Sequence, residues 1–76
     1  MDTPHVYEIR VDGHLTDRWS DWFGGLTIQN EPNGQTTLAG RLNDQAALFG
    51  VLTKLHDLNL ILISVLRLPT KVGFDP

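Results

Sequence analysis

Alternation of apolar and polar residues predicts three strands in the first half of the chain. Residues 6–12 alternate apolar and charged or polar positions, the two-residue period of a strand that rests one face on a core. The same period runs through residues 26–29 and through residues 35–42. Between them, the Glu-Pro-Asn-Gly sequence at 31–34 favours a tight turn, because proline fixes one φ angle and Asn-Gly tolerates positive φ. We therefore expect the second and third strands to form a hairpin.

Helical spacing of apolar residues predicts two helices. A short helix of about two turns is expected over residues 17–23, where three aromatic side chains recur three and four residues apart and a Gly-Gly pair follows. A longer helix is expected after a cap at Asn43 or Asp44, because leucine and valine recur at intervals of three and four through residues 48–58. Asn59 favours the end of this helix, since asparagine adopts the left-handed conformation readily.

The order of these elements indicates the fold class. With a further strand expected over residues 60–68, the chain reads strand, helix, strand, strand, helix, strand. This order is typical of a ferredoxin-like βαββαβ sandwich, an α+β fold in which two helices cover one face of a four-stranded antiparallel sheet. We expect a single domain over residues 1–76, with an ordered core at about 6–68. The tail at 69–76 is expected either to be disordered or to pack through Val72 and Phe74.

The last predicted strand is unusual because both of its faces are apolar. If the even-numbered residues from Leu60 to Leu68 face the helices, the outward row is Ile61, Ile63, Val65 and Arg67. Inverting the register only exchanges which apolar row is exposed. In the strand order 4-1-3-2 that is usual for this fold, the strand is also a sheet edge with unpaired backbone groups, which favours pairing with another chain. We therefore expect a homodimer or higher oligomer with this row in its interface. The alternative is that the tail, or a strongly twisted sheet, hides the row within one chain.

Composition and charge narrow the class of protein. A chain of 76 residues buries only about 60% of the surface that its unfolded form exposes, and without cysteine it has no disulfide or thiolate zinc site to add stability. The net charge of −3, with both signs interspersed, lacks the basic patch expected of a protein that binds nucleic acid or an anionic membrane. The first residues lack the basic and apolar segments of a secretory signal, and the stretch at 58–68 is too short to span a bilayer as a helix. We expect a cytoplasmic protein with neither nucleic-acid nor membrane partners.

The junction between the first strand and the first predicted helix is the candidate ligand site. Gly13 and His14 lie there, where small-molecule regulatory domains of the ACT type, which have the same element order, bring a glycine close to an amino-acid ligand. The Pro-Gly context that such domains tend to carry is absent. Trp19 and Trp22 could form an aromatic ligand clamp. A core role is favoured over this, since Trp19, Trp22 and Phe23 together are what a two-turn helix needs to anchor itself to a sheet.

Candidate catalytic and metal-binding residues are few. His5, His14 and His56 are the only imidazoles, and none of their spacings brings two ring nitrogens to one ion. No hydroxyl lies in a nucleophile elbow or beside a histidine. We therefore expect no metal, no cofactor and no catalytic residue, with a minimal enzyme that uses His14 or His56 as its acid or base kept as an alternative.

Four runs of residues resemble a family of short stand-alone bacterial proteins that carry no assigned activity. They are Tyr7-Glu8-Ile9-Arg10-Val11, Trp19-Ser20-Asp21-Trp22-Phe23, Asp44-Gln45-Ala46-Ala47-Leu48 and Leu62-Ile63-Ser64-Val65. The resemblance covers nearly the whole chain and implies no substrate, cofactor or catalytic residue. The sequence thus favours a non-catalytic oligomeric protein-interaction module, with a small-ligand sensing or binding domain as the alternative.

Overall fold

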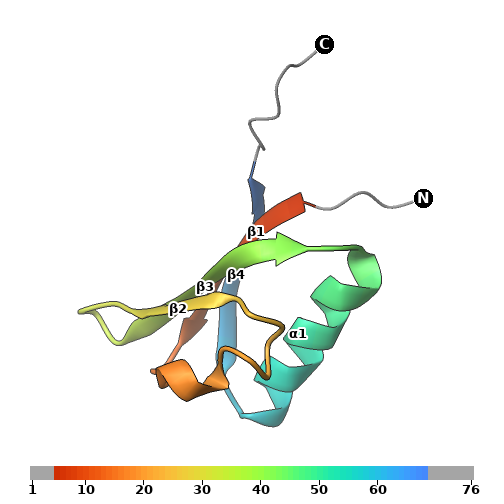
Figure 1. Ribbon diagram of the computed structural model, residues 1–76. Helices are drawn as coiled ribbons and strands as arrows, with labels where there is room; N and C mark the ends of the chain where they lie inside the picture. The colour runs from red at the N-terminus through yellow and green to blue at the C-terminus, as the bar shows by residue number, and fades with distance from the viewer. Residues whose placement is uncertain (1–4, 69–76) are drawn as a thin grey trace.

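One antiparallel sheet forms the framework of the computed structural model, which describes residues 5–68 (Figure 1). The elements are β1 (His5–Asp12), the 3-10 turn η1 (Asp17–Trp19), β2 (Thr27–Asn30), β3 (Gln35–Leu42), α1 (Gln45–Asp57) and β4 (Ile61–Leu68). The strands lie in the order β2-β3-β1-β4, which is the strand order expected from the sequence, and each neighbouring pair is antiparallel. The predicted tail at 69–76, with Val72 and Phe74, lies outside the described residues.

The predicted ferredoxin-like βαββαβ fold is wrong, because one of its two helices does not form. Between β1 and β2 the chain makes only η1 and a series of turns. Two turns of helix are too short to be stable by themselves. Here the Ser20 hydroxyl donates to the carbonyl of Leu26 at 2.7 Å, while the N–H of Gly25 donates to the carbonyl of Ser20 at 2.8 Å. The bond from Gly25 closes the segment in the manner of a helix C-terminus, with Gly24 at φ 80°, so that no regular helix extends through it. The described residues therefore form an α+β domain with a single α-helix.

The single helix α1 begins and ends where the sequence predicts. Asp44 is the N-cap, with extended backbone at φ −160°, and its Oδ1 accepts a hydrogen bond from the N–H of Ala47 at 2.8 Å. At the other end Asn59 takes the left-handed conformation at φ 62°, which lets the N–H of Leu60 donate back to the carbonyl of Leu55 at 3.1 Å. Both caps satisfy backbone groups that a helix end leaves without partners.

The cap at Asp44 gives a testable stability change. Replacing Asp44 with alanine removes the acceptor for the Ala47 N–H and should lower the free energy of unfolding by about 1 kcal/mol. Urea unfolding followed by circular dichroism measures this change. Asp57→Ala is the matched control, because Asp57 ends the helix, where a carboxylate opposes the helix dipole, and its removal should cost nothing. Equal losses in the two variants would contradict the capping role.

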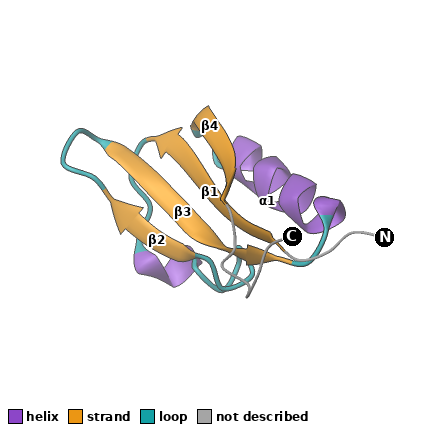
Figure 2. Ribbon diagram, turned by 90° about the horizontal axis from the view of Figure 1, so that it is seen from above, coloured by secondary structure: helices purple, strands orange, loops and turns teal. Residues whose placement is uncertain are grey.

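The core lies between one face of the sheet and the layer formed by α1 and residues 15–26. Figure 2 shows α1 beside the β1 and β4 side of the sheet and the short turn beside β2. Ile9, Val11 and Leu38 have no exposed surface, and Phe23 from the irregular segment is only 1% exposed. The buried apolar side chains of the described range are Tyr7, Ile9, Val11, Leu15, Phe23, Leu26, Leu38, Leu42, Leu48, Val51 and Leu55. Phe23 therefore covers the part of the sheet that the first predicted helix was expected to cover.

A β-bulge in β4 changes which of its side chains face the core. The register of the β1–β4 pair shifts between Arg10 and Val11, which leaves Ile63 as an extra residue on β4. The pairing with β1 decides which face each β4 residue occupies. The helix face, on the side of α1, carries Leu62, Val65 and Arg67, and the opposite, open face carries Ile61, Ser64, Leu66 and Leu68. Strict alternation along β4 is therefore wrong, because one inserted residue exchanges the two faces.

Candidate functional site

The outer strand β4 carries a band of exposed apolar side chains. We define the β4 surface as Ile61, Leu62, Ile63 and Leu66, which are 66%, 49%, 45% and 51% exposed. Their strand is an edge of the sheet, since it pairs only with β1 among the described strands (Figure 2). A strand of eight residues that is both an edge and apolar offers unpaired backbone groups together with hydrophobic surface.

The predicted interface residues only partly coincide with this surface. Ile61 and Ile63 belong to it, whereas Val65 is half-buried and packs against the core. Arg67 is exposed and shares the helix face of the sheet with Val65. Leu66 is a member that alternation missed, because the bulge at Ile63 moves it to the open face. Leu62 keeps the predicted helix face and is nevertheless 49% exposed. The interface made of Ile61, Ile63, Val65 and Arg67 stays a prediction.

The Gly13–His14 junction packs against the β2–β3 hairpin. The N–H of Gly13 donates to the carbonyl of Gly34 at 2.9 Å, and Gly13 has φ +114°, which a residue with a Cβ adopts only with strain. A Cβ on Gly13 would also lie 2.9 Å from Cδ2 of Leu60. His14 is exposed, with Nε2 3.2 Å from the carbonyl oxygen of Glu31. Glycine is thus required here by packing and backbone conformation, and the ligand-binding role of Gly13 and His14 stays a prediction.

Asn30 joins this junction to the sheet, and the sequence reasoning missed it. Its Oδ1 accepts from the N–H of Leu15 at 3.1 Å while its Nδ2 donates to the carbonyl of the same residue at 2.9 Å. The Thr36 hydroxyl lies within hydrogen-bonding distance of both Asn30 Oδ1 and the carbonyl of Gly13, and its single proton is donated to one of them at a time. Before a Glu-Pro-Asn-Gly turn, an asparagine looks like one more turn residue, so no sequence signal marks this role.

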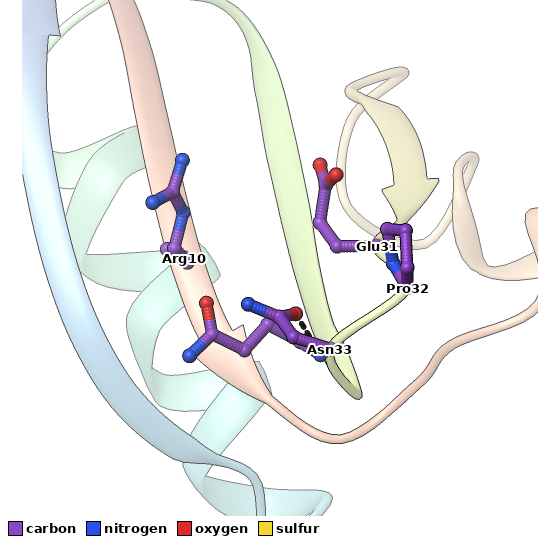
Figure 3. A pocket seen from close by; sticks show the side chains of 5 residues that line it. Arg10, Glu31, Pro32 and Asn33 are labelled. Carbon is purple, nitrogen blue, oxygen red and sulfur yellow. Dashed lines mark hydrogen bonds between the residues drawn. The ribbon is translucent and has the colours of Figure 1, made fainter.

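A polar hollow lies on the open face of the sheet beside the hairpin (Figure 3). Arg10 reaches it from β1, and Glu31, Pro32 and Asn33 line it from the turn after β2, around a volume of about 290 Å³. Gln35 completes the lining, and three of the other side chains have partners within the chain. Glu31 Oε2 accepts from the Thr37 hydroxyl at 3.1 Å, and Asn33 Oδ1 accepts from the backbone N–H of the residue two positions on at 3.0 Å. A guanidinium nitrogen of Arg10 lies 3.9 Å from a carboxylate oxygen of Glu8. The hollow is therefore accounted for as the inner side of a hydrogen-bonded turn.

The aromatic residues of the irregular segment divide between core and surface. Phe23 is buried, Trp19 is partly buried against the core, and Trp22 is 38% exposed. Trp19 and Trp22 lie with ring centroids 5.1 Å apart and planes inclined by 55°. They line a pocket of about 590 Å³ together with Thr16, Arg18 and Asp21. The anchoring role expected of the three aromatics therefore belongs mainly to Phe23, and the two indoles are open on one side.

Residues 5–68 provide neither a cluster of metal-ligating side chains nor a helix that could span a membrane. In this part of the chain no group of three or more histidine, aspartate or glutamate side chains is placed to hold a metal ion. The helix α1 has 13 residues, and none of the described helices has the length and apolar character needed to cross a bilayer.

Together, the fold and the surface define a small α+β domain with one helix, a packed strand–loop junction and an apolar outer strand. The chain belongs to a family described as a domain of unknown function (DUF8691), whose model matches residues 6–66. This match confirms the expectation of an uncharacterised family. No curated protein and no solved structure matches the sequence.

Proposed function

We propose that this chain is a non-catalytic module that acts by self-association, with β4 pairing to β4 of a second copy. The observation that carries the proposal is the β4 surface, where Ile61 is 66% exposed and Leu66 is 51% exposed on an edge strand. An exposed apolar edge of this kind is an aggregation hazard unless another element covers it. A second copy pairs with the edge backbone groups and brings apolar side chains of the two strands into contact.

The sequence of β4 suits antiparallel pairing about a two-fold axis. In such a pair the two identical strands run in opposite directions and use the same surface, so that surface must be complementary to itself. The only charged residue of the strand, Arg67, lies near one end, and antiparallel pairing would place the two copies of this guanidinium at opposite ends of the interface. Ser64, near the middle, would lie close to the axis. Like charges therefore stay apart while the apolar residues meet.

The small core also supports association. A domain of this size has little internal surface to bury, and covering more apolar area is a common way to gain stability. Pairing along the eight residues of β4 would extend the sheet from four strands to eight and bring exposed apolar side chains of the two copies into cross-strand contact. The proposed module thus uses for association the strand that its single helix leaves partly uncovered.

A charge placed on the β4 surface tests the proposal. The parent protein should sediment at twice the 8.5 kDa chain mass at micromolar concentration, and Leu66→Lys should weaken the dimer on the order of hundredfold, because two ammonium groups then take the place of apolar side chains that meet across the pair. Analytical ultracentrifugation over a concentration series measures both states. Gln29→Lys is the matched control, since Gln29 is an exposed residue on the other edge strand and its replacement should leave association unchanged.

Two results would overturn the proposal. One is a parent protein that sediments as a single chain at high micromolar concentration. The other is a Leu66→Lys variant that is folded by circular dichroism and associates as tightly as the parent. The bacterial origin and stand-alone character implied by the resemblance, and the cytoplasmic location expected from the sequence, stay predictions alongside this proposal.

A further inference from the structure

The pocket beside η1 differs from the polar hollow because its charged side chains are not paired with other described side chains. Its lining residues are Thr16, Arg18, Trp19, Asp21 and Trp22, around about 590 Å³, which is within the range of small-molecule sites. All five belong to the segment that replaces the predicted first helix. The site is therefore built where the chain is irregular and next to the core, an arrangement in which a rigid framework holds a binding loop.

Trp22 of this pocket is held in place by a buried ring and by a lysine of α1, and Trp19 packs against the core. The buried ring of Phe23 contacts the indole of Trp22, with ring centroids 5.2 Å apart and planes inclined by 62°. Lys54 of α1 donates from Nζ to the carbonyl of Trp22 at 2.7 Å, and its ammonium lies 5.4 Å from the centroid of the same indole. Neither indole N–H has a hydrogen-bond partner within residues 5–68. The aromatic surface is therefore already positioned, which lowers the cost of ordering it when a ligand binds.

The two charged side chains of the pocket have opposite signs and no side-chain partner in the described chain. Arg18 and Asp21 are both exposed, and neither side chain makes a hydrogen bond or an ion pair with another side chain that the structure describes. A guanidinium presents donors in the geometry that a carboxylate accepts, and a carboxylate accepts from an ammonium group. The Thr16 hydroxyl adds a neutral group that can donate or accept at the rim.

We propose that this pocket binds a free amino acid with an aromatic side chain. The ligand carboxylate pairs with Arg18, its ammonium group pairs with Asp21, and its ring packs against Trp19 and Trp22. A ligand with both charges satisfies both side chains, whereas an amine leaves Arg18 without a counter-charge and a carboxylic acid leaves Asp21 without one. The ammonium of Lys54 already lies over Trp22 and further disfavours a ligand that is only a cation.

Three related probes separate these contributions. L-phenylalanine carries both charges, 2-phenylethylamine lacks the carboxylate and 3-phenylpropionate lacks the ammonium group. Nitrogen–proton NMR spectra of the two indole N–H groups report binding at Trp19 and Trp22 directly. We expect saturable shifts of both signals with L-phenylalanine, and affinity about tenfold lower for each truncated probe, since one charge-assisted contact is lost each time.

Variants assign each charge to its partner. Arg18→Gln should weaken L-phenylalanine about tenfold and leave 2-phenylethylamine unchanged, because that probe has no carboxylate for Arg18 to hold. Asp21→Asn should weaken L-phenylalanine similarly and leave 3-phenylpropionate unchanged. Arg41→Gln and Asp57→Asn change exposed charges outside the pocket and serve as controls. The dispersion of the backbone NMR signals shows that each variant is folded.

Two outcomes would overturn this proposal. They are the absence of saturable indole shifts at millimolar L-phenylalanine, or equal affinity for all three probes, which would indicate stacking on the indoles without recognition of charge. The proposal is independent of self-association. Repeating the titration in Leu66→Lys shows this, because binding should persist in that variant, and loss of the dimer alone would leave the amino-acid site intact.

Discussion

Replacing Phe23 with alanine should lower the free energy of unfolding by about 3–5 kcal/mol, the cost of removing a phenyl ring from a packed core. The side chain is 1% exposed and is among the largest fully buried ones. A domain of 76 residues has a total stability of only roughly 4–11 kcal/mol, at about 0.05–0.15 kcal/mol per residue. The loss is therefore a large fraction of the total, and the unfolding midpoint should fall clearly. Urea or thermal unfolding at fixed protein concentration measures the change, since association also contributes to apparent stability.

Phe49 provides the matched control for this prediction. It is the same residue type on α1 but is 59% exposed, so Phe49→Ala should change stability by less than about 0.5 kcal/mol. The comparison separates burial from the chemical change. If Phe23→Ala were no more damaging than Phe49→Ala, the irregular segment would not be the second cover of the sheet.

Replacing Asn30 with alanine should lower the free energy of unfolding by about 3 kcal/mol. The change leaves the N–H and the carbonyl of Leu15 without their partners and removes an acceptor for the Thr36 hydroxyl. Each part-buried group that loses its partner costs about 1–3 kcal/mol, and water that enters the gap offsets some of this loss. Chemical unfolding measures the total. The loop at residues 13–15 should also exchange its amide protons faster, because these bonds tie it to the sheet.

An isosteric change isolates the donor half of this contact. Asn30→Asp keeps the acceptor for the Leu15 N–H but turns the amide nitrogen into an oxygen that faces the Leu15 carbonyl. We expect it to be destabilising by about 2 kcal/mol at pH 7. Asn33→Asp is the control, since Asn33 Oδ1 only accepts from the N–H of Gln35, and an aspartate accepts equally well. Equal effects of the two aspartate variants would contradict the role given to Asn30.

The elements that the sequence predicts correctly are those whose signals are local. The alternation in residues 6–12 and 35–42, the Glu-Pro-Asn-Gly turn and the stripe of α1 each depend on neighbours in the chain, and β1, β3, the hairpin and α1 all form. The cap at Asp44 and the left-handed Asn59 are confirmed for the same reason. The strand order follows from connecting these pieces compactly.

The sequence-based predictions are wrong where tertiary contacts, and not the local pattern, decide the structure. Trp19, Trp22 and Phe23 have helical spacing, but one buried ring is enough to anchor the segment, and bonds from Ser20 and Gly25 close it as turns. The bulge at Ile63 has no signal in a strand where every neighbour is apolar, so the exposed row could not be assigned. The candidate pocket depends on the same segment: its residues were visible in the sequence, but their convergence required the turn.

The far edge of the sheet has a consequence for the size of any assembly. β2 has four residues, and Thr27 and Gln29 are exposed on it, so this strand offers a short and polar rim. If two copies join through β4, both outer rims of the joined sheet are copies of β2, and neither resembles the strand that was used. Growth into fibrils therefore stops after the first pairing event, and the protein stays dispersed even at high concentration.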